Sequence, residues 1–201
     1  MRWDNLFDDL EGQLEQELSA EELDVQAEEE RLRLGRLALR DRILAVHEAQ
    51  ERDARYDIRM FLADGSGIAV RPVTFGRDWF SADVVDAARR GSQCIIPVTA
   101  IASVALSRAQ LAQSLTGVPG EPTRTSLPAR LSLGFVLRDL CRRRAAVELR
   151  TATGVLHGTI DRVGRDHLDL AVHEPGEPRR DGAVSQVRLV PLGQILLVRL
   201  R

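Results

Sequence analysis

The residues best suited to chemistry are three histidines close together near the C-terminal end of the chain: His157, His167 and His173. Imidazole is a common zinc ligand, but zinc sites usually combine it with cysteine or carboxylate ligands, and no cysteine or carboxylate joins these three at a ligand spacing. Since side chains alternate between the two faces of a strand, the three rings are expected to point in different directions. We therefore expect no metal site.

Nucleophilic chemistry is not indicated either. Cys141 precedes three arginines that would lower the pKa of an exposed thiol, but it shares a helix face with Leu133 and Leu137 and is expected to be buried. Cys94 lies in an apolar strand and is expected to be a core residue. The sequence has no glycine-rich phosphate loop before a helix and no nucleophile elbow. We expect neither a cofactor nor enzymatic activity.

Charge is distributed unevenly along the chain. All 28 basic residues are arginines, and the 201 residues carry a net charge of −2. Residues 1–30 contain twelve acidic residues and one arginine, a balance of −11, whereas the rest of the chain has a balance of +9. The exclusive use of arginine has two explanations, a GC-rich genome or selection for bidentate contacts with carboxylates and phosphates. The sequence leaves both open.

Arginine clusters form a candidate nucleic-acid interface. Aromatic residues that could stack on single-stranded bases are few, and most fall at core-like positions. The alternative is a solvated surface that the acidic N-terminal segment partly neutralises. The candidate residues are Arg89, Arg90, Arg142, Arg143, Arg144, Arg179 and Arg180.

The N-terminal segment is the candidate protein-binding element. Leucines at positions 6, 10, 14 and 18 recur every four residues, which predicts an amphipathic helix with an apolar stripe opposite an acidic face. An isolated helix of this length is marginal in water, so the stripe must be buried against the rest of the chain or against another protein. The partner-binding candidates are Trp3, Leu6, Phe7, Leu10 and Leu14.

Further helices are expected. Ser19 and Glu22 form a capping box, which predicts a helix that continues to about Glu51. Apolar residues at positions 32, 39 and 46 are seven apart, a spacing typical of helix packing and coiled coils. Another helix is predicted over residues 129–144, with Leu133, Leu137, Leu140 and Cys141 on one face.

The sequence contains an internal repeat, in which residues 55–104 and 145–199 form two similar units. Such repetition determines architecture. Pro97–Val104 aligns with Pro191–Val198, and Leu39-Arg40-Asp41 with Leu137-Arg138-Asp139. Val73–Trp79 aligns with Arg162–His167, and the hairpin signal Asp64-Gly65 with Thr153-Gly154. Each unit is expected to contain five short strands. The predicted strands are Tyr56–Leu62, Gly67–Thr74, Asp78–Ala82, Gln93–Pro97 and Ile101–Leu106, then Ala146–Thr151, Val155–Val163, His167–His173, Ser185–Val190 and Ile195–Leu200.

The second unit resembles the Sm-like proteins, a branch of the SH3-like small barrels. Val147–Ile160 and Gly164–Leu170 are similar to the family's first motif, with glycines at strand bends, and Pro191–Ile195 resembles the tight turn between the last two strands. Neither RNA-contact motif of that family is matched, so no RNA-binding residue is implied. The chain as a whole is similar to actinobacterial proteins that begin Met-Arg-Trp.

The resemblance implies an α+β fold with a helical N-terminal arm and two Sm-like, SH3-like five-stranded barrels, each preceded by a helix. We expect an acidic arm over residues 1–30, a first helix and barrel over 31–106, a linker over 107–128, and a second helix and barrel over 129–201. The last strand of one unit is expected to pair with the fourth strand of the other. Val155, Ile160, Leu168 and Leu170 are expected to belong to a core.

These features predict a non-enzymatic, cytoplasmic interaction or assembly module whose acidic arm engages a protein partner or the basic barrels. The alternative is an RNA- or DNA-associated regulatory protein that uses the arginine-rich barrel surfaces. No apolar run is long enough to cross a membrane.

Overall fold

The structure is a computed structural model of the chain, and it describes residues 22, 24–50, 56–85, 92–117, 127–177 and 179–200. The predicted arm helix, with Trp3, Leu6, Phe7, Leu10 and Leu14, lies outside the described residues, as do Arg89 and Arg90.

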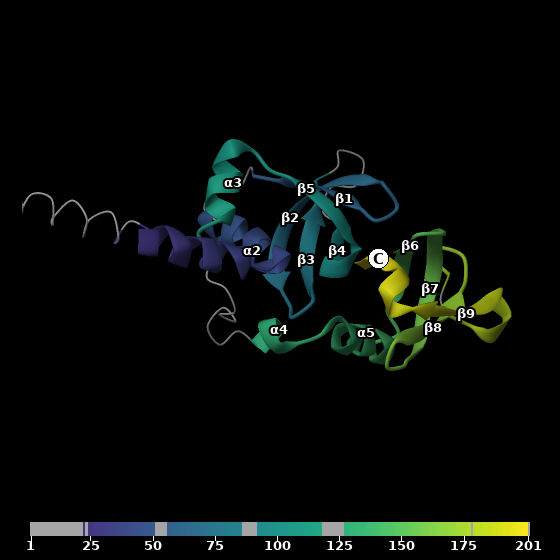
Figure 1. Cartoon of the computed structure of the whole chain (residues 1–201). Helices are drawn as coiled ribbons and strands as arrows, with labels where there is room; N and C mark the ends of the chain where they lie inside the picture. The colour runs from purple at the N-terminus through teal and green to yellow at the C-terminus, as the bar shows by residue number, and fades with distance from the viewer. Residues whose placement is uncertain are drawn as a thin grey trace, which may run out of the picture.

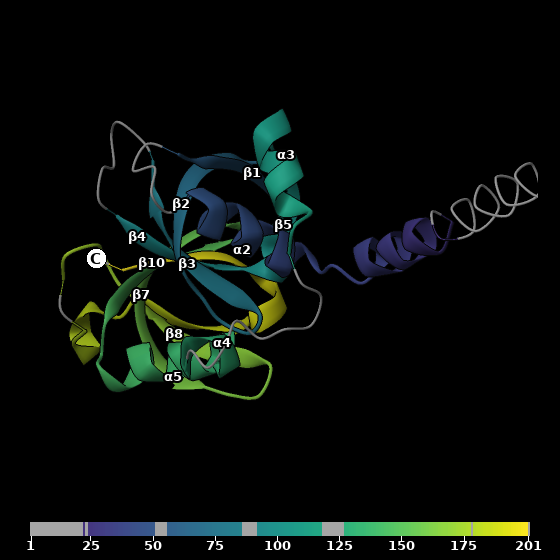
Figure 2. The ribbon, with the colours of Figure 1, turned by 90° about the vertical axis from the view of Figure 1, so that its left-hand side faces the viewer.

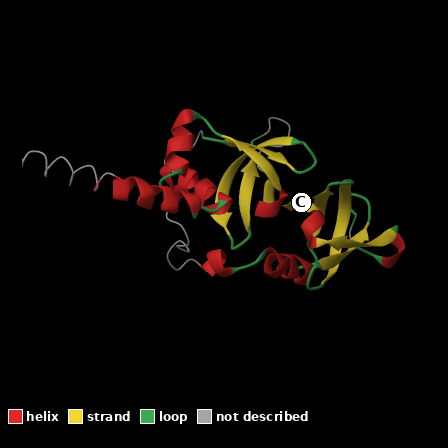
Figure 3. Ribbon diagram, in the orientation of Figure 1, coloured by secondary structure: helices red, strands yellow, loops and turns green. Residues whose placement is uncertain are grey.

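The ten strands form one antiparallel sheet in the order β5-β1-β2-β3-β4-β10-β6-β7-β8-β9. Figures 1 and 3 show the strands of the two halves as neighbouring groups. The prediction of two separate barrels, each preceded by a helix, is wrong. β10 pairs with β6 on one side and with β4 on the other, so the strands continue as one sheet that does not close. The first half contains β1 (Ile58–Leu62), β2 (Gly67–Phe75), β3 (Trp79–Val84), β4 (Gln93–Pro97) and β5 (Ile101–Ala105), and the second contains β6 (Ala146–Thr151), β7 (Gly154–Val163), β8 (His167–Val172), β9 (Gln186–Pro191) and β10 (Ile195–Leu200).

The internal repeat is visible in this strand order. In each half the last strand pairs with the first, and the other strands follow in chain order. A 3₁₀ turn joins the fourth and fifth strands in both halves, η1 (Val98–Ala100) and η3 (Leu192–Gln194). The expected pairing of the last strand of one unit with the fourth strand of the other is confirmed by the β4–β10 ladder.

The sequence forms these strands for local reasons. β1 alternates buried and exposed residues along its five positions, the pattern of a strand with one face on a core. The turn to β2 contains Gly65 at φ 80°, a left-handed conformation that glycine adopts without steric cost. Asp64 accepts hydrogen bonds from the backbone N–H and the hydroxyl of Ser66, which closes this turn.

The helix before the sheet is interrupted. Helical residues extend over 24–35, and α2 (Leu39–Gln50) follows after a break at residues 36–38. The prediction of one continuous helix is therefore wrong, and the break follows Gly35, because glycine is a poor helix former. The segment over 24–35 projects away from the sheet (Figures 1 and 2). At its base, the Arg33 guanidinium donates to the carbonyl oxygens of Leu115 at 2.7 Å and Gly117 at 2.8 Å.

Between the two halves, the described residues form three further helices. They are α3 (Arg108–Ser114), α4 (Leu127–Arg130) and α5 (Leu133–Arg142). α3 lies within the range expected to be a linker, and a capping box between Ser107 and Gln110 starts it. α5 buries Leu133, Leu137 and Leu140, as its spacing predicted.

Each half has its own hydrophobic cluster, but each cluster also contains residues from the other half. Leu196 and Leu197 of β10 belong to the first cluster, whereas Trp79 and Ile95 of the first half belong to the second. The predicted core residues Ile160, Leu168 and Leu170 are fully buried. Val155 is 49% exposed, so its assignment to the core is wrong, because the start of β7 presents this side chain to solvent.

Replacing Gly158 with alanine should destabilise the second half. An added Cβ would lie 2.2 Å from the Ala171 carbonyl oxygen on β8, a backbone atom that can move only with its strand. Overpacking of this kind costs about 1–3 kcal/mol, to be measured by urea unfolding. Gly193→Ala is the control, since no heavy atom lies within 4 Å of its added Cβ. Equal stability of the two variants would contradict the packing described here.

Candidate functional site

The two halves meet at a junction that buries side chains of β4. In the β4–β10 ladder, Ile95 lies opposite Val198 and Cys94 opposite Arg199. Ile95 is only 6% exposed and shares the second cluster with Leu137 and Val198. The side chain of Ile95 therefore belongs to the core of the second half, although its strand belongs to the first.

The loop between β2 and β3 strengthens the junction. The buried Trp79 indole N–H donates to the Leu131 carbonyl oxygen at 3.0 Å, and the Arg77 backbone N–H donates to the same oxygen at 2.9 Å. The Leu133 backbone N–H donates to Asp78 Oδ1 at 2.7 Å, at the start of α5. A buried indole usually finds such a hydrogen-bond acceptor. These bonds attach the first half to the segment that leads into the second.

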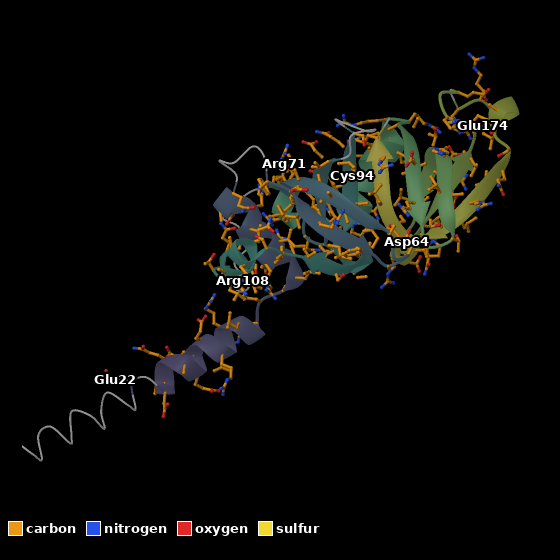
Figure 4. All side chains as sticks on the ribbon, turned by 90° about the horizontal axis from the view of Figure 1, so that it is seen from above. Glu22, Asp64, Arg71, Cys94, Arg108 and Glu174 are labelled. Carbon is orange, nitrogen blue, oxygen red and sulfur yellow. The ribbon has the colours of Figure 1, made fainter. Side chains whose placement is uncertain are left out.

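A further contact crosses between the halves at the β1–β2 turn. Asp64 in this turn lies beside the strands of the second half (Figure 4), and Arg150 Nε of β6 donates to its Oδ2 at 2.7 Å. Desolvation is the largest single influence on Asp64 and by itself would raise the pKa of the carboxyl group. The hydrogen bonds from Ser66 and Arg150 together have a larger effect in the opposite direction, so the pKa of Asp64 is lowered. The carboxylate is therefore kept in its charged form.

The strand pair β8–β9 of the second half has the same register as the pair β3–β4, which lies at the junction. In the β8–β9 ladder His167 lies opposite Pro191 and Asp169 opposite Leu189, which is the register of Trp79 with Pro97 and Ser81 with Ile95 in β3–β4. His167 is thus the counterpart of Trp79, and Leu189 that of Ile95.

The loops before these strands also match. Gly76 N donates to the Trp79 carbonyl oxygen and Gly164 N to that of His167, each at 2.8 Å. A Cβ on Gly76 would lie 2.1 Å from the indole nitrogen of the buried Trp79, so this loop requires glycine. At Gly164 the nearest atoms belong to the His167 ring, whose side chain is 46% exposed and can turn away. Arg40 donates to the Gly76 carbonyl oxygen, and Arg138 to that of Gly164, which confirms that the preceding helices correspond as well.

These counterparts are exposed on the second half. Leu189 is 70% and Val187 54% exposed, and both lie on the same face of β9. The side chains of Asp166 and His167 are 85% and 46% exposed and bond to each other at 2.8 Å. We call Asp166, His167, Val187 and Leu189 the outer surface. It is the candidate functional site, because Trp79 and Ile95, the counterparts of His167 and Leu189 in the first half, are buried at the junction.

The outer surface was not predicted from the sequence. The sequence alignment does show the equivalence on which it depends: when Pro97 is aligned with Pro191, Ile95 is aligned with Leu189, two residues earlier. Only the structure shows that one of these residues is covered and the other exposed.

The predicted nucleic-acid residues near α5 are paired with carboxylates. Arg142 and Arg143 both bond to Asp139, Arg143 through Nε at 2.6 Å. The hydrogen bond from Arg142 is the main reason that the pKa of Asp139 is lowered. Part of the positive charge expected at this end of α5 is therefore offset.

Two more of these arginines share a second carboxylate. Arg179 binds Asp161 with two hydrogen bonds at 2.7 and 2.8 Å, and Arg144 adds a third at 3.1 Å. The pKa of Asp161 is lowered, chiefly by the hydrogen bond from Arg179. Arg180 is exposed. The structure therefore gathers Arg144 and Arg179 around an acid.

The histidines and cysteines have separate environments. His173 is buried and bonds through Nε2 to the Thr159 hydroxyl at 2.9 Å, whereas His167 lies on the outer surface. Within the described ranges, no three His, Cys, Asp or Glu side chains form a group that could hold a metal ion. Cys94 is buried, and burial raises the pKa of its thiol to about 12, so the thiolate nucleophile does not form near neutral pH. Cys141 is partly buried on α5, and its thiol donates to the Asp161 carbonyl oxygen.

The comparisons with known proteins add no relative. No family model matches the chain, and neither a curated protein nor a solved structure matches it. None of the helices in the described part of the chain has the length and apolar character that a bilayer crossing requires. The resemblance to Sm-like proteins stays a prediction.

Proposed function

We propose that this protein is a non-enzymatic interaction or assembly module of the cytoplasm, and that its outer surface binds a protein partner. The observation that carries the proposal is the contrast between Ile95 and Leu189. The two residues hold the same position in duplicated strands, yet the first is 6% exposed and the second 70% exposed.

The chemistry of the outer surface supports a protein ligand. β9 is an end strand of the sheet, and an unpaired strand edge offers backbone N–H and C=O groups to a further strand. Val187 and Leu189 add apolar side chains that lose contact with water when such a strand docks. The acidic arm stays part of the proposal as a second binding element, through Trp3, Leu6, Phe7, Leu10 and Leu14.

Site-specific photocrosslinking tests this proposal. A benzophenone amino acid replaces Val187 on β9 or, as the control, Val155 on β7. The two valines are similarly exposed, at 54% and 49%, but Val155 is paired with Arg150 of β6 inside the sheet, whereas β9 is an end strand. In cells of the native host we expect a crosslinked protein adduct from position 187 and none from position 155.

A second substitution makes the test specific. Leu189→Asp in the chain that carries the probe at position 187 should abolish the adduct, whereas Leu127→Asp should leave it, because Leu127 is equally exposed but lies on α4. Absence of an adduct at position 187, or equal adducts at both probe positions, would rule out the outer surface as the binding site.

The alternative of RNA or DNA binding makes a separate prediction. Affinity for nucleic acid falls with salt in proportion to the number of phosphates contacted. Arg142, Arg143, Arg144 and Arg179 already share two aspartates. In a filter-binding titration over salt, we therefore expect weak binding with a slope equivalent to no more than about two phosphate contacts. A slope equivalent to about six contacts would favour the alternative.

A further inference from the structure

We propose that the partner of the outer surface is a second copy of this chain, whose β5 pairs with β9 as β10 pairs with β4 at the junction. The inference rests on the proposed function, since it names the occupant of the same surface.

The two ends of the sheet are the strands needed for such a contact. β9 is the fourth strand of its half, like β4, and β5 is the last strand of its half, like β10. The β4–β10 ladder within one chain therefore joins the same two kinds of strand that remain at the ends of the sheet. A second copy brings both kinds together again.

The register of the contact follows from the pairing inside each half. Val104 of β5 lies opposite Met60 of β1, and Val198 of β10 lies opposite Leu149 of β6. Both ladders have an irregularity at the same place, next to Ile101 in β5 and next to Ile195 in β10. Val104 is thus the counterpart of Val198.

Because Val198 lies opposite Ile95 at the junction, the contact between copies should place Val104 of one copy opposite Leu189 of the other. In the same register, Ala105 lies opposite Arg188, as Arg199 lies opposite Cys94 at the junction.

The first half has a groove that can accept the Leu189 side chain of a second copy. A groove of about 370 Å³ lies between α2, β5 and α3, and it is lined by Leu39, Arg42, Ile43, Val104, Leu106 and Leu111. Leu39 is the counterpart of Leu137, since both begin the repeated Leu-Arg-Asp sequence. In the second half, Leu137 and Val198 share a cluster with Ile95. In the first half, the counterparts Leu39 and Val104 border an open groove instead.

Each copy has one β9 and one β5, so the association is head to tail. Such a contact continues from copy to copy until it closes a ring or forms an open filament. The proposal therefore expects a mass that rises with protein concentration rather than a single dimer.

Analytical ultracentrifugation of the full chain tests the inference. Leu189→Asp removes the apolar group on β9, and Leu111→Asp places a charge at the rim of the groove beside β5. Both residues are exposed, so the variants should keep the fold, which circular dichroism verifies. We expect the native chain and the Leu127→Asp control to associate with increasing concentration, and each of the other two variants alone to be a monomer.

The mixture of the two variants is the decisive sample. The Leu111→Asp chain keeps an intact β9 and the Leu189→Asp chain keeps an intact groove, so together they should form a 1:1 complex that grows no further. A native chain that stays monomeric up to its solubility limit would overturn the inference, and so would association that persists in both single variants.

The outcomes for the two proposals are distinguishable. A monomeric native chain that still gives the crosslink from position 187 to another protein would overturn the second copy and leave the proposed function standing. A monomeric chain without any crosslink at that position would overturn both.

Discussion

Replacing Trp79 with alanine is expected to lower the free energy of unfolding by about 3–5 kcal/mol. The side chain is 6% exposed and lies in the cluster of the second half, although its strand belongs to the first. Its removal would leave a cavity at the junction and the Leu131 carbonyl oxygen with one hydrogen bond fewer. Urea unfolding followed by circular dichroism measures the loss.

His167→Ala is the matched control, because His167 holds the same position in the second half and 46% of its side chain is exposed. We expect a change within about 0.5 kcal/mol for this variant, as is usual for surface substitutions. Similar losses for the two variants would show that the junction does not bury Trp79 as described.

The second large effect is expected for Leu170→Ala, at about 2–5 kcal/mol. Leu170 is fully buried in the middle of β8 and belongs to the cluster beneath α5. The loss combines the transfer free energy of the removed atoms with the cost of the cavity that remains.

Leu189→Ala provides the comparison for the same substitution on a neighbouring strand, where the leucine is 70% exposed. At a protein concentration that keeps the chain monomeric, its effect should stay within about 0.5 kcal/mol. Thermal or urea unfolding of both variants decides the point. A loss of less than about 0.5 kcal/mol for Leu170→Ala, with the fold intact, would contradict the core of the second half.

The local structure was largely readable from the sequence, and the reason is physical. Strand alternation and turn residues act over a few positions, so the Asp64-Gly65 turn and the strands on either side of it were predicted close to their observed bounds. The duplication, which places Pro97 and Pro191 at the ends of equivalent strands, also appears in the structure.

Whether the strands of each half close into a barrel could not be predicted from such local patterns. The pairing of β10 with β4 was expected, but the prediction of two separate barrels failed, because a strand pattern does not state whether each half closes on itself. In the structure β5 and β9 are the two end strands of one sheet that does not close.

Two other differences have local causes. The helix that the capping box at Ser19 predicted is interrupted after Gly35, and the capping box at Ser107 starts α3 inside a segment whose glycines and prolines indicated a linker. The ion pairs of the arginines also differ in whether the sequence could predict them. The spacing from Asp139 to Arg142 and Arg143 allows pairs on one helix, whereas the contact of Arg179 with Asp161 joins residues that only the fold brings together.

The β4–β10 ladder has a consequence for how the protein responds to dilution. Both strands belong to one polypeptide, so the ladder forms by an intramolecular step whose extent does not depend on the protein concentration. Diluting the protein therefore leaves the two halves joined. A contact made through β9 has no such tether, and its occupancy follows the amount of partner present. If the outer surface binds a partner as proposed, its occupancy changes with concentration, whereas the β4–β10 ladder is a constant part of the molecule.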